Sequence, residues 1–360
     1  MIFHSFPHFG HCLFVFSPSL HYLCSVELTR RLKYHLVAFI VVAIWGSTFV
    51  FTKLLLLSGL TPAQIFTLRF IIAYVLLLGW TVYREWKKGN QLSHLSSLTS
   101  RLSSFTSHLF CKSWRDELLM VALGVTGGSL YFLTENSSMN YTTTTNTSLI
   151  VSLSPLVATF LISLFYKSQR LSRQQTAGSL MAALGVVIVV LNGHFVLHLS
   201  PLGDSLAFGA ALCWGFYSLL MIPAGQRYDT AFVTRKVFIY GLLSMIPYYM
   251  LRPEETWIFT SSVFNFLSSS ETTSIFQFFN SPILLNLLFL GCVASMLCFL
   301  AWNWVLKKLG AVVATNYVYF NPVTTILFAW AILSEQITLW FLLGTVLILV
   351  GMYLADRKKK

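Results

Sequence analysis

The chain has 360 residues, of which 24 are Lys or Arg and 12 are Asp or Glu, so only 10% are charged. Soluble chains carry about 25% charged residues. With 56% hydrophobic residues and a mean hydropathy of +0.71, the apolar content exceeds what one water-soluble core can hold, because a globule still needs a solvated surface. The composition therefore excludes a soluble protein and predicts a chain that crosses a membrane many times.

The charge pattern and the cysteines exclude further classes. The net charge is +12, but the basic residues stand in short clusters between apolar runs, which disfavours nucleic acid as a partner. The six cysteines are scattered over the N-terminal region, a basic loop and apolar runs, and give no disulfide framework. No spacing of His and Cys matches a metal site, so we expect neither a metal nor a cofactor.

Long uncharged stretches predict ten transmembrane helices, and hence an all-α integral membrane protein. In chain order they lie near 35–56, 64–83, 117–137, 146–166, 174–193, 204–223, 233–251, 283–304, 311–333 and 337–355.

The orientation follows from the Lys and Arg residues, which are frequent in every second loop and nearly absent from the others. Because cytoplasmic loops retain positive charge, both ends of the ten-helix unit are predicted to be cytoplasmic. We expect a multi-pass protein of the cell (inner, cytoplasmic) membrane, with the lipid bilayer as its surroundings and a homodimer as a candidate assembly.

The segments outside the helices are predicted from composition. Residues 1–33 lack the basic start and cleavage site of a signal peptide, and are interpreted as a disordered extension or as the result of a start codon placed too far upstream. Residues 84–116, rich in Ser, Leu and basic residues, predict a cytoplasmic loop within the first unit. The predicted organisation is completed by a first unit at 34–193, a linker at 194–203, a second unit at 204–356 and a basic tail at 357–360.

An internal repeat relates the two units. Four matches occur in the same order, at offsets between 166 and 169 residues. They pair Trp45-Gly46 with Trp214-Gly215, Asn136 with Asn303, Ser154-Pro155 with Asn321-Pro322, and Gly178 and Gly185 with Gly344 and Gly351. Each unit holds five predicted helices, an odd number, so the second copy must start on the opposite side of the membrane. Inverted repeats are typical of secondary transporters that work by alternating access.

Four segments carry a resemblance to a known family: 38–50 (AFIVVAIWGSTFV), 64–70 (QIFTLRF), 149–155 (LIVSLSP) and 316–322 (NYVYFNP). They resemble the drug/metabolite transporter (DMT) superfamily and, within it, the ten-helix EamA-type permeases with two EamA-like domains. The resemblance covers roughly 35–355 and implies a small-molecule permease, most often an exporter. Family members often carry Glu at the end of the fourth helix of both halves. This chain has Glu335 in the second copy but Gln169 in the first, so any coupling or bracing role of that Glu is not symmetric.

Charged residues inside apolar spans are candidates for transport, because each costs about 2.5–3.5 kcal/mol on insertion scales. Glu135 and Asn136 lie near the outer end of the third helix, and Tyr131 lies one turn earlier on the same face. Glu135 would bind an amino group or carry a proton, or else pair with Arg69. Arg69, in the second helix, would hold a substrate carboxylate or form a structural ion pair.

Polar and aromatic residues at repeat-related positions complete the candidate site. Pro155 and Pro322 are predicted hinges, because a proline inside a helix breaks the backbone hydrogen-bond ladder. The polar residues expected to line a central cavity beside them are Asn316, Tyr317 and Asn321. Trp45, Trp214 and Tyr217 lie well inside the first helix of each half, where they would either flank the cavity or pack helices together.

The sequence lacks a phosphate-binding loop, a zinc-protease motif and a nucleophile elbow. We therefore expect no enzyme and no ATP-driven pump. The predicted function is transmembrane transport, by alternating access, of a small metabolite or amino-acid-like compound. Export driven by a proton or substrate gradient is the favoured mode. A channel or receptor-like membrane protein is the alternative, since neither needs carrier activity.

Overall fold

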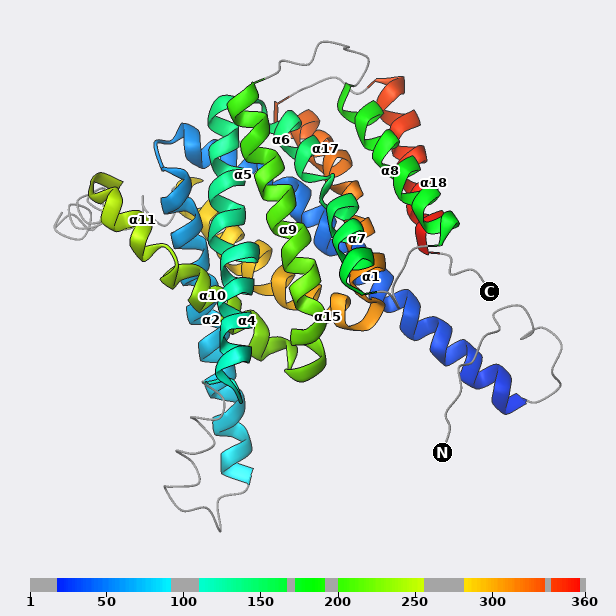
Figure 1. The fold of residues 1–360 in the computed structure, drawn as a ribbon, viewed down its shortest axis with the longest axis horizontal. Helices are drawn as coiled ribbons and strands as arrows, with labels where there is room; N and C mark the ends of the chain where they lie inside the picture. Colours follow the sequence, from blue (N-terminus) through cyan, green and yellow to red (C-terminus); the bar gives the residue numbers. More distant parts are fainter. Residues whose placement is uncertain are drawn as a thin grey trace.

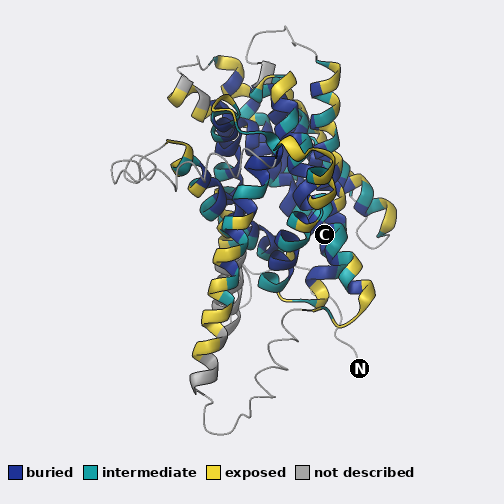
Figure 2. Ribbon diagram, turned by 90° about the vertical axis from the view of Figure 1, so that its left-hand side faces the viewer, coloured by how far each residue is buried: buried dark blue, intermediate teal, exposed yellow. Residues whose placement is uncertain are grey.

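The structure is a computed structural model, and it describes residues 18–91, 110–166, 172–191, 200–255, 282–333 and 338–356. Within these ranges the regular structure is helical and no strand occurs. The helices form one bundle, from which the lower end of α2 and the N-terminal end of α1 project (Figure 1). Buried residues fill the centre of the bundle, and exposed residues cover its periphery and the projecting part of α2 (Figure 2).

Each of the ten predicted spans contains helical structure. The first half holds α1 (Pro18–Leu57), α2 (Pro62–Gln91), α4 (Trp114–Gly124) continuing through the π-helix η1 (Val125–Ser129) into α5 (Leu130–Tyr141), α6 (Thr144–Val151), α7 (Ser154–Phe165) and α8 (Arg173–Leu191). The second half holds α9 (Pro201–Arg227), α10 (Thr230–Leu243), α11 (Ile246–Leu251), α14 (Pro282–Leu288) continuing through the π-helix η3 (Phe289–Leu297) into α15 (Cys298–Leu309), α16 (Ala311–Asn316), the 3₁₀ helix η4 (Tyr317–Phe320), α17 (Asn321–Leu333) and α18 (Leu339–Asp356).

Six helices among the described residues are long and apolar enough to cross a membrane: Leu32–Leu57, Pro62–Arg84, Trp114–Tyr141, Thr144–Phe165, Pro201–Arg227 and Pro282–Leu309. The other four predicted spans are also helical but shorter or interrupted. Two of the interruptions lie directly before prolines, at Pro247 and Pro322, where the missing backbone N–H cannot continue the helical ladder.

The helices extend further than the sequence predicts at two places. Helix α1 starts at Pro18, within the predicted extension 1–33, and α2 continues to Gln91, within the predicted loop 84–116. Hydropathy marks the apolar part of a helix, whereas residues such as Arg84 and Lys87 are good helix formers that continue it outside the apolar layer.

The last helices of the two halves, α8 and α18, lie side by side and antiparallel (Figure 1). Gly178 contacts Gly351 and Gly185 contacts Gly344, and each contact is the counterpart of the other under the repeat. A Cβ added to Gly185 would lie 2.7 Å from the amide nitrogen of Ile348. Small residues thus allow these two backbones to approach closely, as is common between membrane helices.

Three pairs of aromatic residues at repeat-related positions also contact each other in the core. The ring centroids of Trp45 and Trp214 lie 5.3 Å apart, and those of Phe70 and Phe238 lie 5.0 Å apart. A third pair, Phe132 and Phe299, is separated by 6.2 Å. Contacts between equivalent residues are expected where two copies meet about a twofold axis, so the centre of the bundle is the interface between the two halves.

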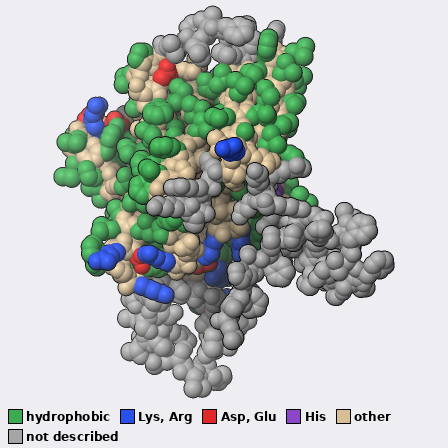
Figure 3. Space-filling view, turned by 45° about the vertical axis from the view of Figure 1, so that its right-hand side comes forward, with side chains coloured by type: hydrophobic (Ala, Val, Ile, Leu, Met, Phe, Trp, Pro, Cys, Tyr) green, Lys and Arg blue, Asp and Glu red, His purple; other side chains and the backbone are tan. Residues whose placement is uncertain are grey.

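Ion pairs connect α4 to α9 and α10 at one end of the bundle. Asp116 accepts hydrogen bonds from Arg227 (2.5 Å) and from the hydroxyl of Tyr228 (2.8 Å). Glu117 accepts hydrogen bonds from Lys236, which is 4% exposed, and from the hydroxyl of Tyr240. Several Lys and Arg side chains gather with acidic ones at the lower end of the molecule (Figure 3).

We expect Gly185→Leu to destabilise the protein, because the larger side chain would force α8 away from α18. Overpacking of this kind costs about 1–3 kcal/mol. The matched control is Gly79→Leu, also a substitution in a helix, where a Cβ meets nothing within 4 Å. Thermal unfolding in detergent should show a lower midpoint for Gly185→Leu only, and equal midpoints would contradict the close contact of α8 with α18.

Glu117→Gln should also destabilise the protein, because it leaves the buried ammonium of Lys236 without a counter-charge. Breaking a buried pair in this way costs about 3–5 kcal/mol, and the 24% exposure of the Glu117 side chain places the effect at the low end. The control is Glu254→Gln in the exposed pair Arg252–Glu254, whose N–O distance is 3.9 Å. The same unfolding assay should leave this control unchanged, and a similar loss in both variants would refute a specific role for Glu117.

Candidate functional site

A cavity lies between the two halves of the bundle and is lined by residues from both. The space between atoms there measures about 410 Å³ when the part open to solvent is included. Six of the residues predicted from sequence line it: Trp45, Arg69, Tyr131, Glu135, Trp214 and Asn321. These residues come from five different helices, α1, α2, α5, α9 and α17, so the fold gathers groups that are far apart in the chain.

The acidic group of the cavity is Glu135 in α5. It is 7% exposed, and its Oε1 accepts a hydrogen bond of 2.7 Å from the hydroxyl of Tyr131, one turn earlier on the same helix. The sequence predicts this shared face correctly. The hydrogen bond orients the carboxyl group and leaves its other oxygen available to a ligand.

The basic group of the cavity is Arg69 in α2, which is only 1% exposed. Its Nε donates a 2.8 Å hydrogen bond to Oγ of Ser295, and its guanidinium lies 4.4 Å from the ring centroid of Phe132. Across the described ranges, no carboxylate oxygen lies within 4.0 Å of its nitrogens. The alternative expectation, that Glu135 pairs with Arg69, thus finds no contact at ion-pair distance among the described residues. Glu135 acts on Arg69 only through a longer electrostatic attraction.

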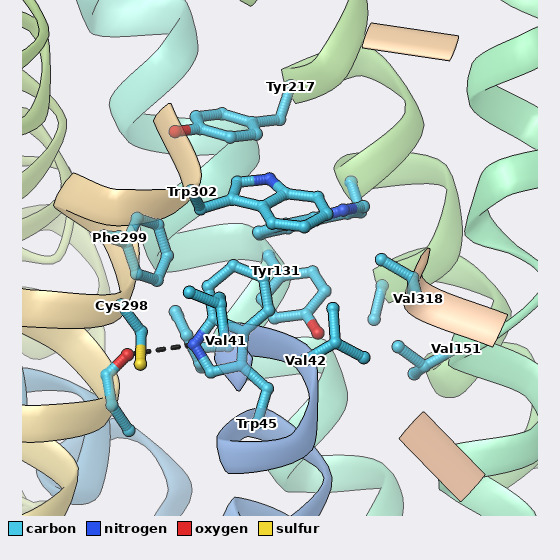
Figure 4. Close-up of a cluster of buried hydrophobic side chains, with 14 of the residues drawn as sticks. Val41, Val42, Trp45, Tyr131, Val151, Tyr217, Cys298, Phe299, Trp302 and Val318 are labelled. Atoms are coloured by element: carbon cyan, nitrogen blue, oxygen red, sulfur yellow. Dashed lines mark hydrogen bonds between the residues drawn. The ribbon is translucent and has the colours of Figure 1, made fainter. Parts of the chain in front are cut away.

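Aromatic side chains form the wall beside these charges. The ring of Trp45 lies edge-on to that of Trp214. Its centroid is 5.1 Å from that of Trp302 and 5.6 Å from that of Phe299, and these three rings are labelled in Figure 4. The indole N–H of Trp45 donates a 2.9 Å hydrogen bond to the backbone carbonyl of Ala294, drawn dashed in Figure 4. This wall is apolar and fixed by ring contacts, and can pack against the apolar part of a bound molecule.

Both predicted hinge prolines lie at breaks in their spans. Pro155 follows the break between α6 and α7, and Pro322 follows η4 at the start of α17. The residues directly before them, Ser154 and Asn321, line the cavity. Within the part of the chain that the structure describes, Ser154 Oγ and Asn321 Oδ1 find no hydrogen-bond partner. The breaks thus place polar groups at the cavity wall.

Four predicted site residues lie outside the cavity lining and are bonded elsewhere. Tyr217 donates to Oδ1 of Asn303 at 2.5 Å, and Asn136 donates to the carbonyl of Pro62 at 3.3 Å. Ser179 donates to Asn316 at 3.4 Å, and Tyr317 shares a 2.6 Å hydrogen bond with His35. Glu335, the candidate for coupling or bracing, lies outside the described residues.

Sequence reasoning missed Ser295 and Phe132, the two residues that hold Arg69. A serine or phenylalanine in an apolar run is ordinary in a membrane helix, so composition gives no signal for either. For Ser295 the structural signal is the π-helix η3, whose counterpart η1 lies at the repeat-related position of the first half, and such helices are frequent at functional sites. Phe132 lies outside η1, in α5.

Comparisons with known proteins agree with this architecture. A curated archaeal protein from Archaeoglobus fulgidus, called an "uncharacterized transporter", is 24% identical over 91% of this chain and 98% of its own length. A "probable amino-acid metabolite efflux pump" from Salmonella typhimurium is 25% identical and covers 88% of this chain and 92% of itself. A "probable terminal-alkyne amino-acid exporter" from Streptantibioticus cattleyicolor is 23% identical over 67% of this chain and 74% of itself.

The fold also has a counterpart among solved structures. One crystal structure superposes with a TM-score of 0.59 at 18% sequence identity, over 90% of this chain and 96% of the other. The model of the EamA-like transporter family matches residues 32–191 and again residues 201–355. With nearly the whole bundle covered by two consecutive matches, the chain belongs to the EamA-like transporter family.

Proposed function

We propose that this membrane transporter is a permease that exports a small amino-acid-like metabolite by alternating access. One observation carries the proposal. The cavity between the halves holds a buried guanidinium without a close carboxylate among the described residues, with a buried carboxylate on the neighbouring wall. Charges buried in this way are costly in a membrane protein and usually mark a substrate or ion pathway.

A zwitterion complements the two groups. Its carboxylate would accept hydrogen bonds from the Nη atoms of Arg69, and its ammonium would donate to the free oxygen of Glu135. The rest of the molecule would pack on the rings of Trp45 and Trp214. The names of two relatives, an amino-acid metabolite efflux pump and an amino-acid exporter, support the same substrate class.

In this proposal the movement comes from the duplicated architecture. The two halves are inverted copies, a relation supported by the antiparallel contact of α8 with α18 and by the self-contacts of equivalent aromatic residues. The breaks before Pro155 and Pro322 act as hinges that open the cavity to one side and then to the other. A proton or substrate gradient drives the cycle, both chain ends face the cytoplasm of the cell membrane, and a homodimer is the candidate assembly.

A channel or receptor-like protein is the second candidate, since neither needs two access states. A single cavity between two similar halves favours a carrier, because a channel requires a continuous pathway with sites weak enough for rapid passage.

Arg69→Gln and Glu135→Gln should each reduce export, because each removes one charged partner of the zwitterion. Hydrogen bonds to charged groups contribute about 1.5–3 kcal/mol, so export at subsaturating substrate should fall about tenfold or more. The measurement is mass-spectrometric profiling of the medium of cells that express each variant, wild type or empty vector at equal membrane levels. The controls are Arg252→Gln and Glu254→Gln at the exposed pair. Export retained in both cavity variants would overturn the proposed site.

Carrier and channel are separated by counterflow in proteoliposomes. If the protein is a carrier, vesicles loaded with unlabelled substrate should transiently accumulate labelled substrate above its equilibrium concentration. The reason is that the binding site carries unlabelled substrate out and returns with labelled substrate. Monotonic, non-saturating equilibration of the label would instead favour the channel.

A further inference from the structure

Two contacts between helices are equivalent under the repeat. One of them contains the contact of Arg69 with Ser295, and the other is its apolar counterpart. Helix α2 lies on η3 with Ile72 against Gly291, and α10 approaches α4 and η1 with Tyr240 against Gly124. These two contacts are equivalent under the repeat. In the same register, Ser295 corresponds to Gly128, and Arg69 corresponds to Val237.

The counterpart contact needs no polar side chain. Gly128 lies against the backbone of α10, where a Cβ would be 3.8 Å from the carbonyl oxygen of Val237. Of these two equivalent contacts between the halves, one is therefore made by a glycine beside a valine, and the other by a serine bonded to an arginine. Because the architecture forms without the polar pair, the desolvation of a guanidinium and a hydroxyl at this position is not required by helix association.

The hydrogen bond to Ser295 also decides which edge of Arg69 stays available. A guanidinium can hold a carboxylate bidentately at its Nη1/Nη2 edge or at its Nε/Nη2 edge. Ser295 Oγ, which is fully buried, occupies Nε at 2.8 Å, and the ring of Phe132 covers one face of the group at 4.4 Å. The edge that remains for a ligand in the cavity is Nη1/Nη2.

We propose that Ser295 is a positioning residue that fixes the Nη1/Nη2 edge of Arg69 toward the cavity and so selects substrates with a free carboxylate over their uncharged amides. This inference rests on the proposed function and deepens it. Without the hydroxyl, the guanidinium would rotate about its last bonds and lose the geometry for two parallel hydrogen bonds.

The experiment uses the full chain in proteoliposomes. The vesicles are loaded with an equimolar mixture of the proteinogenic L-amino acids and their carboxamides, and initial release is followed by mass spectrometry after subtraction of protein-free liposomes. The variants are Ser295→Ala, Ser295→Gly, which installs the residue found at the equivalent position of the first half, and Ser295→Thr, which keeps a hydroxyl.

The matched control is Ser129→Ala. It removes a buried serine hydroxyl of η1, bonded to Ser244 Oγ at 2.7 Å, without touching Arg69. Size-exclusion profiles show whether each variant is folded. If Ser295→Ala is not folded, Ser295→Gly provides the test.

Ser295→Ala and Ser295→Gly should raise the KM for the transported amino acid about tenfold. The rate for its amide should change little, so the ratio of amino-acid release to amide release should fall. Ser295→Thr should restore the preference, and Ser129→Ala should keep it. A preference unchanged in both the Ala and Gly variants overturns the positioning role while the proposed function stands. An equal loss in Ser129→Ala also overturns it, because the effect would then be general. Release of no amino acid by wild type contradicts the proposed function, and the positioning role with it.

Discussion

The proposed function depends on a guanidinium kept inside an apolar bundle of helices, that of Arg69. Transfer of a cation from water into a protein interior costs several kcal/mol. For Arg69 this cost is offset by one hydrogen bond to Ser295, by the face of Phe132 and by the more distant charge of Glu135. None of these contacts neutralises the cation as an adjacent carboxylate would. In the proposed function, the carboxylate of the substrate takes this adjacent place.

The two copies of the repeat are similar in their packing but differ in their charged residues. Equivalent tryptophans and phenylalanines of the two halves contact each other at the centre, and the repeat-related glycines bring α8 and α18 together. The charged residues break this similarity: Arg69 corresponds to Val237, and Glu135 corresponds to Trp302. The positions of the second half that correspond to the two charged residues are therefore apolar. Both charged side chains of the cavity lining, Arg69 and Glu135, thus come from the first half.

The sequence predicted the helical spans, the family and most of the charged corner of the cavity, because these depend on strong signals. A charge in an apolar run is rare, so Arg69 and Glu135 stand out, and the helical spacing places Tyr131 beside Glu135. The sequence predicts less well how each helix is rotated about its axis, and therefore which of its side chains face the cavity. Helices surrounded by lipid are apolar on every side, so no hydrophobic contrast reveals that Tyr217 and Asn316 bond outside the cavity lining, or that Ser295 meets Arg69 across the two halves.

The central claim is that Arg69 receives the carboxylate of a molecule carried between the two halves. It is tested most directly by an experimental structure of the purified protein with the exported metabolite bound. The account predicts ligand density in the cavity with a carboxylate on the Nη atoms of Arg69 and the hydrogen bond from Nε to Ser295 retained. A ligand bound elsewhere, or an Arg69 paired directly with Glu135 while the substrate is bound, would contradict it.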